Sequence, residues 1–256
     1  MGIIAISGKG GTGKSTLSAL IIRWFRDHEM GPILAVDADP NVNLNDLLGV
    51  RLEETVGSIR EELKKSAHKL PGGMTKQEFL EYKIQASLRE TRDFDLIAMG
   101  RPEGPGCYCY ANNMLRDILK SLSQNYKVTV IDNEAGMEHL SRRTTQKIDL
   151  LLIVSDPSAR GVRAAGKISR LLSELDTRVG KKLLVLNRVK GSIPDFLDKI
   201  IEEQGLELFS SIPEDDTLFQ MDQSGKPIWK IADDSPAYQA VHRMMDELMG
   251  RKNNRD

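Results

Sequence analysis

Residues 3–16 read Ile-Ile-Ala-Ile-Ser-Gly-Lys-Gly-Gly-Thr-Gly-Lys-Ser-Thr, a short apolar run followed by a glycine-rich loop. The loop matches the pattern G-x-x-x-x-G-K-[ST] and leads directly into a helical pattern. Glycines let the backbone wrap closely around phosphate groups, and the amino end of the following helix attracts their negative charge. Lys14 supplies a cation for the outer phosphates, and Ser15 supplies a hydroxyl for Mg²⁺. The predicted ATP- or ADP-binding loop comprises Gly8, Lys9, Gly10, Gly11, Thr12, Gly13, Lys14, Ser15 and Thr16.

The rest of the chain alternates apolar runs with helical patterns. The apolar runs lie at residues 3–7, 33–37, 94–99, 128–132, 150–155 and 183–187. Strands that are apolar throughout and separated by helices indicate a mostly parallel, twisted sheet with helices on both faces. We therefore predict an α/β fold and a single domain over residues 1–256. The charged helical segments at about 51–90 are interpreted as an insertion that forms a solvated cover.

The composition is balanced in charge, so a nucleic-acid or membrane partner would need a local charged patch. The chain has 36 Lys plus Arg and 37 Asp plus Glu, a net charge of -1, so no global field attracts nucleic acid or an anionic membrane. Hydrophobic residues make up 40% of the sequence, enough for a full core. No apolar run is long enough for a transmembrane helix, and the first residues lack the basic leader of a signal peptide. We expect a cytoplasmic protein without a nucleic-acid or membrane partner.

Acidic residues follow two of the predicted strands. Asp37 and Asp39 alternate at the end of the second strand, which places their side chains on the same side, and Asp132 ends the fourth. Carboxylates at this edge can hold Mg²⁺ or orient an attacking water, whereas an aspartate here can also simply form a turn. We predict that Asp37 joins Ser15 in binding Mg²⁺ and that Asp132 belongs to the nucleotide site.

Lys9 is a second lysine, near the start of the loop, and with it the chain resembles the deviant Walker A family of P-loop ATPases, of the SIMIBI class. That family includes chromosome-partitioning and division-site ATPases, the nitrogenase iron protein and metal-cofactor maturation ATPases. The resemblance implies that Lys9 reaches across a two-fold dimer to the partner's nucleotide and assists hydrolysis together with Lys14. It also implies that Asp39 positions the attacking water, that Asn187 reads the adenine edge, and that Pro213 lies beside the base. Without the resemblance, a turn role suits Asn187 equally well.

The two cysteines, Cys107 and Cys109, are separated by one residue. A disulfide is not expected in a cytoplasmic chain. Two thiolates can bind a thiophilic ion, but a closed tetrahedral site needs four ligands, which two chains would supply around a two-fold axis. The alternative is a pair of small buried side chains. The histidines show no pair at metal-ligand spacing; they are His28, His68, His139 and His242.

The Lys9 loop and the segments 37–41, 103–113 and 132–139 together resemble the nickel-maturation ATPases of carbon monoxide dehydrogenase and acetyl-CoA synthase. This likeness implies an ATPase that forms a homodimer in its ATP-bound or metal-bound state. It implies that Cys107 and Cys109 of both chains bind Ni²⁺ or Zn²⁺, and that the protein helps to load nickel into one of those enzymes.

Two other functions within the family make different demands on the sequence. Electron transfer like that of the nitrogenase iron protein needs two well-separated cysteine ligands in each chain, and the segment 132–139 has none. A partitioning or septum-placing ATPase predicts a DNA surface or a C-terminal membrane helix. The methionine-rich stripe of the helical pattern at 236–249 is explained more simply by packing against the core.

Overall fold

The apolar run before the glycine-rich loop forms β1 (Ile3–Gly8), an inner strand of an eight-stranded sheet with the order β3-β4-β2-β5-β1-β6-β7-β8. Every neighbouring pair is parallel except β3 and β4, which are antiparallel. This computed structural model describes residues 2–65, 73–101, 122–134, 147–173 and 178–251. The predicted α/β class with a mostly parallel sheet is confirmed.

The elements alternate along the chain. The strands are β1 (Ile3–Gly8), β2 (Ile33–Asp37), β3 (Arg89–Glu90), β4 (Asp95–Ala98), β5 (Val128–Asp132), β6 (Lys147–Ser155), β7 (Arg178–Val189) and β8 (Leu208–Pro213). The α-helices are α1 (Lys14–Asp27), α2 (Leu44–Leu47), α3 (Val56–Lys65), α4 (Lys76–Ser87), α6 (Ala159–Ser173), α7 (Phe196–Glu203), α8 (Asp216–Gln223) and α9 (Pro236–Leu248). Two short 3₁₀ helices are η2 (Ser123–Asn125) and η3 (Ile228–Lys230).

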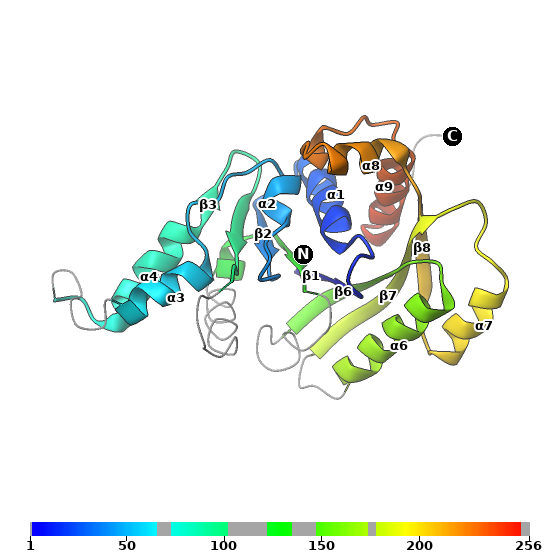
Figure 1. Ribbon diagram of the computed structural model, residues 1–256, viewed down its shortest axis with the longest axis horizontal. Coiled ribbons are helices and arrows are strands. Elements are labelled where there is room, and N and C mark those ends of the chain that lie inside the picture. Colours follow the sequence, from blue (N-terminus) through cyan, green and yellow to red (C-terminus); the bar gives the residue numbers. More distant parts are fainter. Residues whose placement is uncertain (1, 66–72, 102–121, 135–146, 174–177, 252–256) are drawn as a thin grey trace.

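Helices cover both faces of the sheet. In Figure 1, α1, α8 and α9 lie on one face, while α6 and α7 lie on the other. Successive side chains along a strand point to opposite faces of the sheet. In β1, Ile4 and Ile6 pack with α1 and α9, whereas Ala5 packs with α6 and α7. The inner strands β1, β2 and β5 are therefore buried on both sides, which explains why they are almost entirely apolar.

The helix α1 is the centre of one layer. Trp24 and Phe25 are fully buried, and the Trp24 indole N–H donates to Asp246 Oδ1 of α9 at 3.2 Å. Met244 and Met245 of α9 are buried in the same cluster. The methionine stripe near the end of the chain is therefore part of the core, as the sequence predicted.

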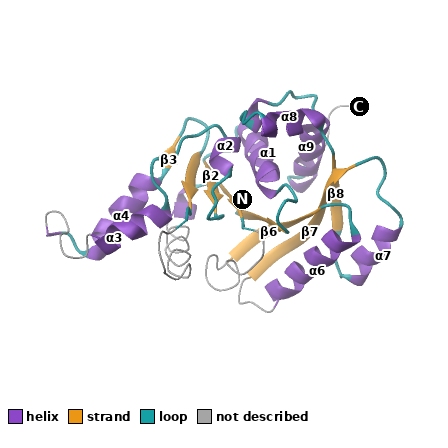
Figure 2. Ribbon diagram, in the orientation of Figure 1, coloured by secondary structure: helices purple, strands orange, loops and turns teal. Residues whose placement is uncertain are grey.

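Two helices, α3 and α4, lie where the sequence predicts a helical insertion. Figure 2 shows them projecting from one end of the molecule, beside the short edge strand β3. Thr75 and Glu78 form a capping box at the start of α4, which satisfies the first backbone N–H groups of this helix. The assignment of one domain to the whole chain stays a prediction. Within the described ranges, no helix has the length and apolar character needed to cross a membrane.

The register of the sheet brings the functional candidates together. Asp37 at the end of β2 is paired with Asp132 at the end of β5, and Ile6 of β1 is paired with the same Asp132. The carboxyl ends of three neighbouring strands thus meet beneath the glycine-rich loop, at the edge where parallel sheets bind their ligands.

Candidate functional site

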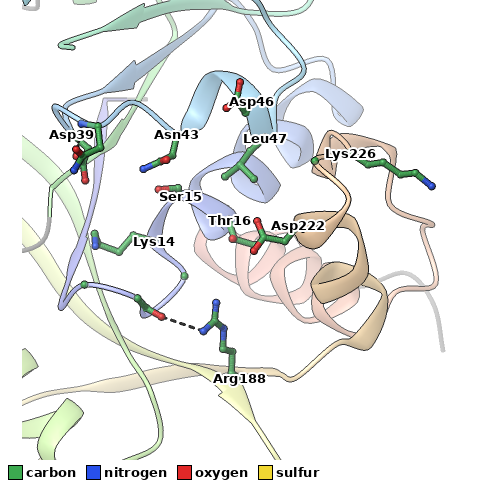
Figure 3. Close-up of a pocket in the computed structure, with 15 residues that line it drawn as sticks. Lys14, Ser15, Thr16, Asp39, Asn43, Asp46, Leu47, Arg188, Asp222 and Lys226 are labelled. Carbon is green, nitrogen blue, oxygen red and sulfur yellow. Dashed lines mark hydrogen bonds between the residues drawn. The ribbon is translucent and has the colours of Figure 1, made fainter. Parts of the chain in front are cut away.

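A cavity of about 530 Å³ opens at this edge, between the glycine-rich loop, the segment that follows β2 and the end of α8. Figure 3 shows Lys14, Ser15 and Asp39 on one part of its wall, with Arg188 and Asp222 on another. Its size is that of a typical small-molecule site. The lining residues are Gly10, Gly11, Gly13, Lys14, Ser15, Thr16, Asp39, Asn41, Asn43, Asp46, Leu47, Arg188, Asp222, Gly225 and Lys226.

The glycine-rich loop is closed by its own hydrogen bonds. Thr12 donates from its backbone N–H and its hydroxyl to the Lys9 carbonyl, and Lys14 Nζ lies 3.3 Å from the same oxygen. Burial lowers the pKa of Lys14, while the carboxylates of Asp132, Asp39 and Glu134 act in the opposite direction. The loop therefore holds a buried ammonium group at the amino end of α1, where backbone N–H groups also attract anions.

Gly13 is required at its position for two reasons. Its φ is +88°, in the left-handed region, and a Cβ there would lie 2.3 Å from Asn187 Nδ2. That amide donates to the Thr12 carbonyl at 2.8 Å and ties the loop to β7. A side chain at Gly13 would therefore strain the backbone and displace this tie.

Gly13→Ala is expected to lower the free energy of unfolding by about 2 kcal/mol, roughly half from left-handed backbone strain and half from the lost hydrogen bond. Gly11→Ala is the matched control, because Gly11 has φ +80° but nothing within 4 Å of an added Cβ. The control is expected to lose only about 1 kcal/mol. Urea unfolding measures both variants, and equal losses would show that the Asn187 contact contributes nothing.

Asp37 and Asp132 form a buried carboxylate pair below the cavity. Both are almost inaccessible to solvent. Burial raises the pKa of Asp37 to about 6, although the N–H groups of Leu44, Asp39 and Asn43 favour its charged form. Burial and the neighbouring Asp37 raise the pKa of Asp132 to about 7. Two buried carboxylates of this kind are stabilised by an added cation. Their oxygens, with the Ser15 hydroxyl nearby, have the chemistry that suits Mg²⁺.

The hydrogen bonds of Asp37 identify it as an organiser of the segment that follows β2. Its Oδ1 accepts from the Asp39 N–H at 3.0 Å, and its Oδ2 accepts from the N–H groups of Asn43 and Leu44 at 2.8 and 2.9 Å. The turn-forming interpretation is therefore correct for this residue, and its role as a Mg²⁺ ligand stays a prediction. Asp132, in turn, accepts from the Ser18 hydroxyl at 3.3 Å.

Asp39 lies in the segment that follows β2, and its role in positioning water stays a prediction. It lines the cavity opposite Lys14 and accepts from the Asn41 N–H at 2.8 Å. The nearby Val42 has φ +46°, which is unusual for a β-branched residue. This segment is thus held in a strained conformation by the Asp37 hydrogen bonds described above.

Asn187 and Pro213 are the residues predicted to contact the adenine base. Asn187 is buried and uses its amide N–H to hold Thr12, and neither Asn187 nor Pro213 is among the residues that line the cavity. Their contact with adenine stays a prediction. The next residue, Arg188, does line the cavity; it has φ +59°, and its Nη1 donates to the Gly11 carbonyl at 3.1 Å.

Several lining residues were missed by the sequence reasoning. Arg188 ends up in the cavity because β7 is irregular near its end, where its register with β8 shifts between Leu186 and Val189. Asp222, Gly225 and Lys226 come from the end of α8, which carries no recognisable motif. Asn41, Asn43, Asp46 and Leu47 could have been inferred, because they continue the segment that contains Asp39.

The remaining predicted residues are placed as follows. Lys9 is exposed at the tip of the loop and lies outside the lining of the cavity. Gly8 is buried at the end of β1, and Thr12 is buried beneath the loop. Cys107 and Cys109 lie outside the described residues, as do His68 and His139.

Comparisons with known proteins agree with this geometry. The sequence model of the CobQ/CobB/MinD/ParA nucleotide binding domain matches residues 3–228. An uncharacterized ATP-binding protein of Methanocaldococcus jannaschii is 42% identical over 98% of this chain and 99% of its own length. The carbon monoxide dehydrogenase accessory protein CooC of Rhodospirillum rubrum is 29% identical over 97% of this chain and 96% of its own length.

Among solved structures, the septum site-determining protein MinD of Pyrococcus horikoshii, complexed with Mg-ADP, superposes with a TM-score of 0.69. It is 23% identical and covers 96% of this chain and 95% of its own. At this identity the likeness shows the fold alone.

Proposed function

This chain belongs to the CobQ/CobB/MinD/ParA nucleotide-binding domain family, and on that premise we propose that it is a dimeric, ATP-hydrolysing metallocentre maturation factor. The nucleotide part of this proposal is supported by the cavity at the amino end of α1, which Lys14, Ser15 and Asp39 line. The similarity to a carbon monoxide dehydrogenase accessory protein supports the maturation part.

Each residue of the cavity has a defined task in this proposal. Lys14 and the N–H groups of the loop bind the phosphates of ATP or ADP, and Ser15 with the buried carboxylates holds Mg²⁺. Asp39 orients the attacking water. Transfer of a phosphoryl group to water depends on positioning the reacting groups and compensating their charge rather than on a covalent intermediate with the protein. A loop anchored on the inner strand β1 suits this requirement.

Lys9 is proposed to act on the nucleotide of a second copy of the chain. Its side chain is exposed and is not among those that line its own cavity, which is the situation expected of a residue that serves a partner. A lysine that reaches the phosphates only in the dimer would couple dimerisation to hydrolysis. We expect Lys9→Ala to retain ATP binding and to lose hydrolysis.

Cys107 and Cys109 are proposed to bind Ni²⁺ or Zn²⁺ between two chains. Two thiolates per chain give the four ligands of a closed site, and the dimer implied by Lys9 supplies the symmetry. ATP and metal each favour the dimer, so each should strengthen the binding of the other. The recipient of the metal is proposed to be carbon monoxide dehydrogenase or acetyl-CoA synthase.

The cysteine proposal is tested by gel filtration with metal analysis, with and without ATP. The parent protein is expected to form a dimer that carries cysteine-bound metal, and Cys107→Ser and Cys109→Ser are each expected to lose that metal while still binding ATP. The amount of metal bound at the cysteines is the metal content of the parent minus that of the variant. A monomer that carries one cysteine-bound metal ion per chain with or without ATP contradicts the shared site.

The alternative is a regulatory ATPase of the MinD or ParA kind, which acts on a membrane or on DNA. The resemblance in fold to MinD favours it. The helix α9, however, buries Met244 and Met245 in the core and leaves no methionine-rich face for a lipid surface. Co-sedimentation with lipid vesicles or DNA in the presence of ATP tests this alternative, and binding would support it.

A further inference from the structure

Two histidines that are far apart in the sequence meet at the carboxyl end of α1. His28 caps α1, and His242 lies in α9; the centres of their rings are 5.0 Å apart. Asp246 lies one helical turn after His242 and contacts both residues. The spacing of the histidines along the sequence concealed this cluster, because only the packing of α1 against α9 creates it.

The position of His28 is fixed by the way α1 ends. Glu29 adopts φ +52°, its N–H donates to the Arg26 carbonyl at 2.9 Å, and the Met30 N–H donates to the Phe25 carbonyl at 3.0 Å. These two bonds form a Schellman motif, which fixes the chain at the end of a helix. The His28 ring also stacks on Trp24, with 4.1 Å between the ring centres.

The hydrogen bond of His28 leaves one ring nitrogen free to bind a cation. Its Nδ1 lies 2.8 Å from the Trp24 carbonyl oxygen, which can only accept, so Nδ1 carries the proton. In the neutral ring, Nε2 then has a lone pair, and it lies 3.9 Å from Asp246 Oδ1. A histidine that binds a metal through one ring nitrogen commonly donates the N–H of the other nitrogen to a backbone carbonyl, which fixes the orientation of the ring.

The distances within the cluster suit a metal ion. One ligand atom from each of His28, His242 and Asp246 lies within 4.8 Å of the other two. His242 Nδ1 is 3.0 Å from Asp246 Oδ2. In a tetrahedral zinc site, bonds of about 2.0–2.1 Å place neighbouring ligand atoms about 3.3 Å apart. The two measured distances, 3.0 Å to Oδ2 and 3.9 Å to Oδ1 of Asp246, lie on either side of this value, so small side-chain movements would bring one carboxylate oxygen and both imidazoles around an ion.

The surroundings of the cluster fix the Asp246 carboxylate and leave the His242 side of the cluster open to solvent. The Asp246 side chain is only 9% exposed and accepts from the Trp24 indole N–H, whereas the His242 side chain is 35% exposed. His28 and His242 line a cavity of about 590 Å³. Two guanidinium groups line this cavity, and both are paired with acids: Arg23 with Asp27 and Asp233, and Arg26 with Asp27.

We propose that His28, His242 and Asp246 bind a divalent transition-metal ion of the Zn²⁺ type, with solvent supplying the fourth ligand. Two imidazoles and a carboxylate form a set that Zn²⁺ accepts and Mg²⁺ does not favour. The site lies at the opposite end of α1 from the phosphate-binding loop, a distance of about 21 Å for a helix of 14 residues. It uses neither the cysteines nor the nucleotide, so it does not rest on the proposed function.

The test uses full-length protein carrying Cys107→Ser and Cys109→Ser, which removes the cysteine ligands. Zn²⁺ titration by calorimetry is expected to show one ion per chain, with the same affinity in the presence and absence of Mg-ATP. Co²⁺ is expected to quench the fluorescence of Trp24, because this ring stacks on His28. Mg²⁺ alone is expected to leave the fluorescence of Trp24 unchanged.

His242→Gln in that background is expected to weaken Zn²⁺ binding at least about tenfold and to abolish the Co²⁺ quenching. Asp246→Asn is expected to act similarly while keeping an acceptor for the Trp24 indole. Gln239→Ala is the matched control, since this uncharged residue lines the same cavity outside the three ligands, and the variant should bind Zn²⁺ as the parent does. Parental affinity in His242→Gln, or no Zn²⁺ binding by the cysteine-free protein, overturns the inference.

Discussion

Asp132→Asn is expected to stabilise the nucleotide-free protein at pH 8 by roughly 2–4 kcal/mol. Asp132 is 1% exposed, and burial together with Asp37 raises its pKa from 3.8 to about 7. That difference in pKa corresponds to about 4 kcal/mol, and the gain is smaller because Lys14 loses a compensating charge. Asparagine keeps an oxygen that can accept the Ser18 hydroxyl.

The pH dependence follows from the direction of the shift. The folded state holds the Asp132 proton more tightly than the unfolded state does. The charged Asp132 side chain therefore lowers the free energy of unfolding, and this cost is absent below about pH 4. The cost grows as the pH rises from about 4 to 7 and is complete above about pH 7. The variant should therefore lose less stability than the parent over this interval.

Urea unfolding at pH 5 and pH 8 measures this effect. Asp46→Asn is the control, because this acid lines the cavity but is exposed, and its stability should stay within about 0.5 kcal/mol of the parent. A variant that is no more stable than the parent at pH 8 would show that the Asp132 carboxylate is already well compensated in the folded protein.

Lys14→Ala is expected to weaken ATP binding by about 30-fold to 5,000-fold, which corresponds to the 2–5 kcal/mol typical of losing one partner of a buried charge pair. Lys14 is 7% exposed at the first position of α1, so its ammonium group meets the phosphates with little competition from water. The acids around it, Asp132, Asp39 and Glu134, would then repel the nucleotide without compensation.

Binding of a fluorescent ATP analogue measures the loss, and circular dichroism verifies that the variant is folded. Lys199→Ala is the matched control: it removes an exposed lysine of α7, on the opposite face of the sheet, and should bind ATP as the parent does. An affinity of Lys14→Ala within about threefold of the parent would exclude the glycine-rich loop as the phosphate site.

Local patterns predicted the fold and the loop because they depend on residues close together in the sequence. Three strand ends could be recognised in the sequence: the end of the apolar run before Gly8, Asp37 and Asp132. Parallel strands bring such ends to one edge of the sheet. What such patterns cannot contain is the contact between distant segments. The Asn187 bond to Thr12 and the meeting of His28 with His242 arise only from packing.

The central position of β1 has a consequence for how the protein is made. Ile4 pairs with Val130 on one side and with Leu150 on the other, so its neighbours are synthesised long after it. Contacts between such distant segments form slowly, and an unpaired apolar strand meanwhile invites aggregation. The nascent chain is therefore open to aggregation through β1 until β6 emerges from the ribosome. Slower translation up to that point lengthens the time for which β1 is unpaired.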